Sequence, residues 1–170
     1  MDRICRTLVS VGYEVLLVGR KLSESLPLQE LPYMTRRLRC RIRNGALFYA
    51  EFNTRLYFFL RKQQVDIIGA VDYDTLKAVT KAASEKRGVK VVLDCHEWFE
   101  EVPELHGRDR VRNYWIRIAR EGIPQANLRY TVSESIAKKL QERYGSSFAV
   151  IRNTPELIDD DPPSEREDII

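Results

Sequence analysis

The sequence predicts an α/β fold with a doubly wound, mainly parallel sheet and helices on both faces. Short aliphatic segments alternate at least four times with segments of helical periodicity, and this alternation is typical of a parallel sheet built from βαβ units. The aliphatic segments are nearly continuous, as in Val65–Val71, which indicates strands covered on both faces. Sheets of this kind bind ligands outside the carboxyl ends of their strands, so the residues that follow the strands are the first candidates for a site.

The first half of the chain contains two predicted helices and two predicted strands. Apolar residues at helical spacing predict the first helix, which Gly12 ends. After a proline-containing loop, a period-two pattern predicts a strand with one apolar face and one cationic face. A stripe of Phe48, Phe52, Leu56 and Phe59 predicts the second helix after the Asn44-Gly45 turn. In chain order the elements are helix Asp2–Val11, strand Tyr13–Arg20, loop 21–32, strand Arg36–Arg43 and helix Ala46–Lys62.

The second half repeats strand and helix. Gly88 and Gly122 end two of the helices, and Ser133 is a capping residue that begins another. The predicted elements are strand Val65–Val71, helix Tyr73–Arg87, strand Val89–Leu93, helix Arg108–Glu121, strand Leu128–Val132, a helix from Ser133 to Tyr144 and strand Phe148–Ile151.

These elements predict one domain over residues 1–152, followed by an acidic linker or tail over 153–170 without buried periodicity. A doubly wound domain normally begins with a strand, whereas this chain begins with a helix. We therefore expect a first strand and its turn ahead of Met1.

The composition is that of a globular domain. Of 170 residues, 44% are hydrophobic and 31% are charged, which are ordinary values. No apolar run approaches the roughly 20 residues that span a bilayer, and the N-terminus has no signal-peptide pattern. Cys5, Cys40 and Cys95 form no CxxC pair, which fits reduced, buried thiols. We expect a cytoplasmic protein.

Polar clusters follow four of the predicted strands, and in a parallel sheet they meet at one edge. His96 is the leading candidate for chemistry, because an imidazole can orient a hydroxyl nucleophile or accept its proton. Asp94 or Glu97 can hold the ring in one tautomer. A histidine satisfied by backbone groups is the competing interpretation, and Cys95 is a weak candidate because neighbouring strand residues point in opposite directions. The clusters comprise Asp72–Thr75, Asp94–Glu97, Ser133–Ser135 and Arg152-Asn153.

Asp72 and Asp74 allow two interpretations. Carboxylates at this spacing can hold a divalent ion that bridges phosphates, or they can cap the helix that follows. The cap is favoured, because no further residues complete a metal shell and neither histidine has metal-ligand spacing. We therefore predict no metal. The glycine-rich phosphate motifs GxGxxG and GxxxxGK[ST] are also missing.

Charge is distributed unevenly along the chain. Residues 1–62 hold twelve basic and five acidic residues, a net of +7, and residues 153–170 hold seven acidic residues and one arginine, a net of −6. The basic face of the second predicted strand is either a solvated edge or a contact for an anionic membrane surface. Nucleic acid is not expected, since no binding module is present. The face is formed by Arg37, Arg39, Arg41 and Arg43.

Six segments resemble the group 1 bacterial glycosyltransferases of family 4, which have the GT-B fold. The resemblance covers most of the chain up to Pro155, and the last three segments are the most specific. The segments are GYEVLLVGR (Gly12–Arg20), LFYAEFNTRL (Leu47–Leu56), VDYDTL (Val71–Leu76), LDCHEWFEEVPEL (Leu93–Leu105), YTVSESIAKKL (Tyr130–Leu140) and VIRNTP (Val150–Pro155).

The resemblance implies a Rossmann-like, acceptor-side domain, one half of the GT-B fold. In this family a second domain binds the nucleotide-sugar donor, and transfer to a glycan or lipid-linked acceptor retains the anomeric configuration. The resemblance places His96 in the cleft between the two domains. It places Ser133, Arg152 and Asn153 at the rim of that cleft or toward the hinge. No cofactor is implied apart from the donor.

The donor domain and the first strand are not found in this sequence, so the resemblance also implies a chain that is inactive by itself. The competing hypothesis is a non-catalytic Rossmann-like binding module that contacts the inner face of the membrane peripherally through the arginine-rich strand.

Overall fold

The computed structural model describes residues 1–154, and in it the strands form two parallel sheets. The first sheet pairs β1 with β2, and the second runs in the order β3-β4-β5-β6. The predicted α/β class with parallel strands is confirmed, although the expected single sheet is divided. The predicted tail from residue 155 onward lies outside the described residues. The strands are β1 (Leu16–Lys21), β2 (Met34–Arg39), β3 (Ile67–Val71), β4 (Lys90–Cys95), β5 (Leu128–Thr131) and β6 (Ala149–Val150).

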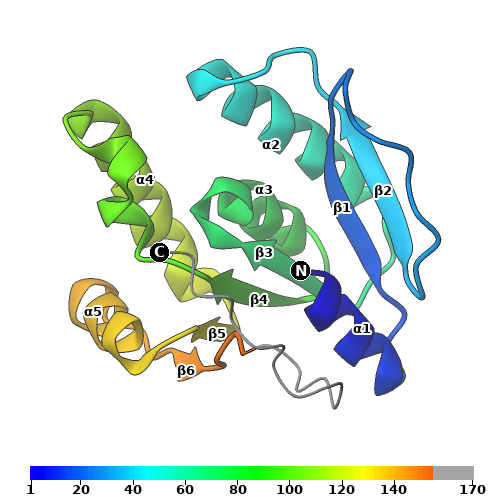
Figure 1. Ribbon diagram of the computed structural model, residues 1–170. Coiled ribbons are helices and arrows are strands. Elements are labelled where there is room, and N and C mark those ends of the chain that lie inside the picture. The colour runs from blue at the N-terminus through cyan, green and yellow to red at the C-terminus, as the bar shows by residue number, and fades with distance from the viewer. Residues whose placement is uncertain (155–170) are drawn as a thin grey trace, which may run out of the picture.

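Helices cover the sheets from both sides. Figure 1 shows α2, α3 and α4 beside one another, with α5 to the left of β5 and β6 and α1 next to the β1–β2 pair. Each predicted helix and strand is present, with its ends shifted by a few residues. None of the helices in residues 1–154 is long and apolar enough to cross a bilayer. The helices are α1 (Asp2–Ser10), α2 (Gly45–Arg61), α3 (Asp72–Ser84), α4 (Asp109–Gly122) and α5 (Glu134–Tyr144), with 3₁₀ turns at Phe99–Glu101, Pro103–Leu105 and Ile123–Gln125.

The core lies between the four-stranded sheet and the layer of α2, α3 and α4. Leu76 of α3 and Leu93 of β4 are fully buried at its centre. The aromatic stripe predicted for α2 is confirmed, because Phe52 and Leu56 are buried and Phe48 and Phe59 pack against the same cluster. The three cysteines are buried and unpaired, as expected.

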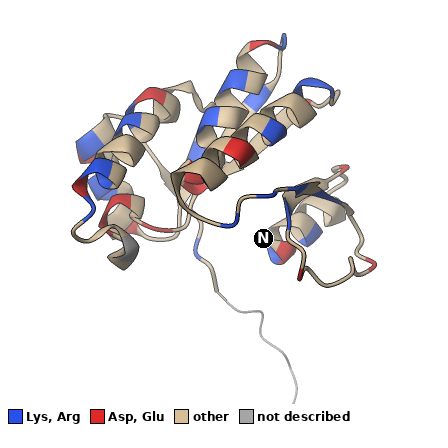
Figure 2. Cartoon of the chain, turned by 90° about the horizontal axis from the view of Figure 1, so that it is seen from above, with Lys and Arg blue, Asp and Glu red and all other residues tan. Residues whose placement is uncertain are grey.

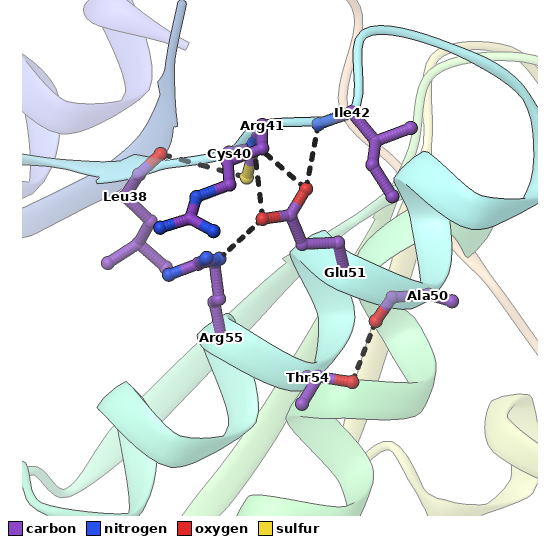
Figure 3. Close-up of polar contacts among 8 residues, drawn as sticks. All are labelled: Leu38, Cys40, Arg41, Ile42, Ala50, Glu51, Thr54 and Arg55. Carbon is purple, nitrogen blue, oxygen red and sulfur yellow. Dashed lines mark hydrogen bonds and ion pairs between the residues drawn. The ribbon is translucent and has the colours of Figure 1, made fainter.

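The predicted strand Arg36–Arg43 is wrong at its end, because β2 stops at Arg39. Glu51 of α2 is the physical reason. Its carboxylate accepts the backbone N–H of Arg41, with a shortest N–O distance of 2.9 Å, and that of Ile42 at 2.9 Å, so these amides turn toward the helix (Figure 3). Arg55 donates to the same carboxylate at 2.8 Å. The hydrogen bonds from Ile42 and Arg55 hold the pKa of Glu51 below its ordinary value.

β1 and β3 are less buried than their aliphatic sequences predict. All of β1 except Lys21 is half-buried, and Ile67 of β3 is 44% exposed. Only the face of β3 that carries Ile68 and Ala70 is buried against the helices. The prediction that both strands are covered on both faces is therefore wrong for residues 1–154.

The contact between α3 and α4 depends on a glycine. A Cβ added to Gly122 would lie 2.6 Å from Cγ and 2.7 Å from Cδ2 of Leu76, and Leu76 has no free space because it is fully buried. The helices approach this closely because Gly122 has no side chain.

We expect Gly122→Ala to lower the free energy of unfolding by about 1–3 kcal/mol, the usual cost of overpacking a core. Urea denaturation measures the change. Gly19→Ala is the control, because nothing lies within 4 Å of a Cβ at that position. Adding Leu76→Val to Gly122→Ala should recover part of the loss, and purely additive effects would show that this contact is not the cause.

Candidate active site

The carboxyl ends of β3, β4, β5 and β6 form one edge, as the sequence predicted. The parallel register pairs Val71 with Asp94, and Thr131 with both Cys95 and Val150. Asp72, His96, Ser133 and Arg152 come just after these strand ends. The ladder therefore brings segments distant in sequence to the same side of the sheet.

His96 and Asp94 form the central pair of this edge. Nε2 of the ring lies 2.9 Å from Oδ2 of Asp94, and the two side chains are 28% and 4% exposed. Since an ionised carboxylate only accepts hydrogen bonds, this contact assigns the proton to Nε2 and leaves Nδ1 as the acceptor of the ring. Of the two carboxylates considered from the sequence, Asp94 makes this contact, whereas Glu97 is exposed.

Asp72 holds the backbone of His96. Its Oδ1 accepts the His96 N–H at 3.0 Å, across the β3–β4 edge. Asp72 has φ +51°, a left-handed conformation that is uncommon outside glycine and costs of order 1 kcal/mol. The sequence favoured Asp72 or Asp74 as a helix cap. Both residues lie in the first turn of α3, where an acidic residue suits the helix dipole, but no side-chain hydrogen bond caps this helix. Thr75 instead bonds the N–H and C=O of Val71 through its hydroxyl, at 3.0 Å each.

Burial raises the pKa of Asp72 and of Asp74 to about 6. Burial disfavours a charged carboxylate, and the charge of Asp72 adds to the effect on Asp74. The amides of Asp74 and Thr75 oppose it, so a weak capping role remains for Asp74. Buried carboxyl groups with a raised pKa, one of them bonded to the backbone of a histidine, are a common feature of functional sites.

Burial also governs the neighbouring groups. It raises the pKa of the Cys95 thiol, so Cys95 is not a ready nucleophile. It raises the pKa of Tyr130 as well, with a further contribution from the Asp94 carboxylate. Both groups stay neutral near pH 7 and contribute shape and hydrogen-bonding capacity rather than charge.

A buried ion pair that the sequence did not reveal anchors the segment after His96. Glu100 is 1% exposed, and its Oε2 lies 2.5 Å from Nε of Arg143 in α5. Arg112 of α4 donates to the Glu100 carbonyl at 3.0 Å and pairs with Glu101. The sequence shows Glu100 as one of several acidic residues in this segment, and nothing in that pattern identifies a partner more than 40 residues away.

Aromatic rings lie beneath the same segment. Tyr73 and Phe99 have ring centroids 5.2 Å apart, and Phe99 and Trp115 have theirs 5.4 Å apart in an edge-on arrangement. The Tyr73 hydroxyl is buried without a hydrogen-bond partner in the described residues. The chain following His96 is therefore held by packing as well as by the Glu100–Arg143 ion pair.

The remaining candidates at this edge have structural contacts. Ser133 caps α5, as predicted, by accepting the Ile136 N–H at 3.3 Å. Asn153 accepts from Arg3 of α1 at 2.9 Å, and Arg152 is exposed beside it. They share the edge with His96 through the strand order, but no hydrogen bond joins these three residues to His96 within residues 1–154.

The arginines lie away from this edge, on the β1–β2 sheet, where basic residues are visible in Figure 2. Arg37 and Arg39 belong to β2, whereas Arg41 and Arg43 lie in the loop after it. They do not form one strand face. Arg37 donates to the Leu26 carbonyl, and Arg43 donates to Ser23 at 3.0 Å and pairs with Glu24 at 3.5 Å.

Within the described residues, no group of three or more His, Cys, Asp or Glu side chains is arranged to hold a metal ion. Asp72 and Asp74 do not converge with a third ligand, and Asp94 is engaged with His96. The site therefore presents a histidine, carboxyl groups and neutral hydroxyl groups.

Parallel strands with helices on both sides define an α/β domain of the doubly wound class, with a histidine–aspartate pair at its carboxyl edge. The particular family follows from sequence comparison. The profile of Glycosyltransferase Family 4 matches residues 1–161, and the chain belongs to this family. No curated protein matches the chain. The fold and the family together define an acceptor-side domain of glycosyltransferase type.

We expect Asp72→Asn to stabilise the protein above pH 6 by about 1–3 kcal/mol, because asparagine keeps the acceptor for His96 without a buried charge. The folded-state pKa of about 6 lies above the ordinary 3.8, so the folded protein binds the proton more tightly than the unfolded chain. The free energy of unfolding of the wild type therefore falls as pH rises from about 4 to about 6.

Urea denaturation between pH 4 and 8 measures this dependence. The gain from Asp72→Asn should vanish near pH 4, where Asp72 is protonated in the folded protein. Asp66→Asn, at an exposed position, is the matched control and should leave the pH dependence unchanged. A pH profile for Asp72→Asn that runs parallel to the wild type would contradict the buried carboxyl.

Proposed function

We propose that this chain is the acceptor-side domain of a retaining glycosyltransferase, which transfers a sugar from a nucleotide-sugar donor to a hydroxyl of a glycan or lipid-linked acceptor. The observation that carries the proposal is the His96–Asp94 pair, 2.9 Å apart, at the carboxyl edge where sheets of this class bind ligands. Family membership supports the reaction class.

The proposed role of His96 follows from its hydrogen bonds. Asp94 holds the proton on Nε2, so Nδ1 accepts a hydrogen bond from the acceptor hydroxyl and orients its oxygen. The oxygen forms its bond to the anomeric carbon on the same face from which the nucleoside diphosphate leaves, which retains the configuration. As that bond forms, the bond from the carbon to the diphosphate breaks, the diphosphate departs as an anion, and the hydroxyl proton passes to Nδ1. Asp94 and Asp72 are positioning residues, because one sets the tautomer and the other holds the His96 backbone.

In the part of the chain that the structure describes, no basic side chain contacts the His96–Asp94 pair, so none is placed there to hold the diphosphate. The groups around His96 are carboxyl groups and neutral hydroxyl groups, and Arg152 is exposed at the far end of the edge. Stabilisation of a leaving anion is usually the largest catalytic contribution. We therefore assign the donor and its diphosphate to a second domain, and we expect residues 1–170 alone to be inactive.

In a two-domain protein that contains this chain and a donor-binding domain, we expect His96→Ala to reduce kcat by about 10²–10⁴, the usual contribution of a proton-accepting residue. Steady-state transfer assays measure the change. His106→Ala is the matched control, because it removes the second histidine of the chain at an exposed position.

Asp94→Asn should also lower kcat, because an asparagine can donate to Nε2 and favour the wrong tautomer. Thermal denaturation of each variant separates a loss of activity from a loss of folding. A two-domain protein that remains fully active with His96→Ala would exclude this site.

A second proposal concerns the β1–β2 sheet. A hollow of about 280 Å³ there is lined by Arg20, Arg36 and Arg37 together with leucines of the preceding loop. Leu26 is 79% exposed. Arginines beside exposed leucines match an anionic lipid surface, where the charges meet headgroups and the leucines meet the acyl region. We propose peripheral membrane contact at this face, away from His96.

We expect the protein to sediment with vesicles that contain about one third phosphatidylglycerol, and not with phosphatidylcholine vesicles. Arg36→Ala should weaken binding about five-fold, since an arginine near such a surface contributes about 1 kcal/mol. Arg110→Ala, exposed on α4, is the control. Binding that persists in about 1 M salt would contradict the electrostatic mechanism.

A further inference from the structure

One oxygen of the buried Asp94 carboxylate needs a donor from within the protein. Oδ2 contacts Nε2 of His96 at 2.9 Å, whereas Oδ1 is buried and accepts no hydrogen bond of ordinary geometry within residues 1–154. The Asp94 side chain is only 4% exposed, so Oδ1 is closed to bulk water and to a molecule bound at the surface of the site. Because a charged oxygen is costly to bury without a donor, its partner is expected among the neighbouring side chains.

The register of the strands identifies those neighbours. Figure 1 shows β4 between β3 and β5, in agreement with the strand order. Asp94 is paired with Val71 of β3 on one side and with Tyr130 of β5 on the other. Residues paired in this way direct their side chains to the same face of a sheet. Valine has no side-chain donor, so the tyrosine hydroxyl is the cross-strand group that can serve Oδ1.

The electrostatic surroundings of Tyr130 agree with this assignment. Tyr130 is half-buried, and burial raises the pKa of its hydroxyl. Hydrogen bonding to Asp94 raises that pKa further, and so does the charge of the Asp94 carboxylate. A tyrosine with a raised pKa keeps its proton at neutral pH, so its hydroxyl remains a donor toward an anionic neighbour.

We propose that Tyr130 is a positioning residue of the site, whose hydroxyl donates to Oδ1 of Asp94 while Oδ2 accepts from His96. The torsion that rotates an aspartate carboxylate is broad, so a single hydrogen bond to the ring leaves the carboxylate free to turn. A donor at each oxygen fixes it in the orientation that keeps the ring proton on Nε2. The effect on sugar transfer rests on the proposed function of His96, whereas the hydrogen bond itself does not.

With Tyr130 included, His96 is aligned from both strands that flank β4. Asp72, directly after β3, accepts the His96 backbone N–H at 3.0 Å. Tyr130 of β5 holds the carboxylate that orients the ring. The backbone and the imidazole of His96 are thus fixed by opposite neighbours in the sheet, and Nδ1 keeps one direction relative to the carboxyl edge.

Nuclear magnetic resonance of the full chain tests the hydrogen bond without any transfer reaction. The ring nitrogens of ¹⁵N-labelled histidine report the tautomer at about pH 8.5, well above the ordinary titration range of histidine. We expect the Nε2–H tautomer of His96 to predominate in the wild type. Tyr130→Phe should lower the ratio of Nε2–H to Nδ1–H about ten-fold, as for the loss of one hydrogen bond to a charged group. His106, which is exposed, is the internal reference.

Two further variants show whether the hydroxyl acts through Asp94. Thr131→Val is the matched control, because it removes the buried hydroxyl of the next residue in β5, whose side chain lies on the opposite face of the sheet. This variant should leave the tautomer ratio unchanged. In an Asp94→Asn background, Tyr130→Phe should cause no additional change, since the carboxylate through which it acts is gone.

A transfer assay of a two-domain protein that contains this chain gives the catalytic consequence. Tyr130→Phe should lower kcat about ten-fold with little change in KM, because it misaligns the proton acceptor without removing a substrate contact. Thr131→Val should leave kcat at the wild-type value.

The failure of this inference is distinct from the failure of the proposed function. An unchanged or higher Nε2–H ratio in a Tyr130→Phe protein that remains folded by circular dichroism would overturn the role of Tyr130, even if His96→Ala abolishes transfer. A lowered ratio in Tyr130→Phe, together with full transfer activity of His96→Ala, would reject the proposed function and support the hydrogen bond.

Discussion

The hydrogen bond from the His96 amide to the Asp72 carboxylate is the interaction on which the site depends. It joins the ends of two neighbouring strands, and it requires a carboxylate buried enough for its pKa to rise to about 6. It also holds Asp72 at φ +51°. Strain and desolvation both oppose folding, so the surrounding core must compensate for them. A residue that served only to begin α3 would need neither the burial of its carboxylate nor the left-handed backbone conformation.

The contacts around the segment after His96 also stabilise the arrangement that strain and desolvation at Asp72 oppose. Glu100 is buried with Arg143, and Arg112 bonds the Glu100 backbone. Buried ion pairs add little net stability compared with apolar packing, but they fix one geometry because breaking them leaves an isolated charge. This segment therefore obtains its conformation from α4 and α5, and His96 is held from both ends, by Asp72 on one side and Glu100 on the other.

The sequence predicted the parallel strands and their common carboxyl edge, because both follow from local hydrophobic periodicity and from the rules for parallel connections. It did not predict that the strands form two sheets. It predicted poorly whatever depends on distant contacts. The end of β2 is set by Glu51, which lies in the next helix. The sequence favoured a capping role for Asp72 because the residue stands at the start of α3. Its hydrogen-bond partner is the His96 amide, which is 24 residues away in the sequence. Glu100 carried no signal that pointed to Arg143. Local sequence patterns do not identify contacts between residues that are distant in sequence and become neighbours only in the folded protein.

The site and the β1–β2 pair belong to different parts of the fold. The four-stranded sheet with α3, α4 and α5 contains every residue that holds His96, whereas the β1–β2 pair connects to this unit mainly through α2. Asp94 and Asp72 take their positions from the ends of β4 and β3. The local chemistry of His96 therefore depends on the four-stranded sheet and its helices, and not on β1 and β2.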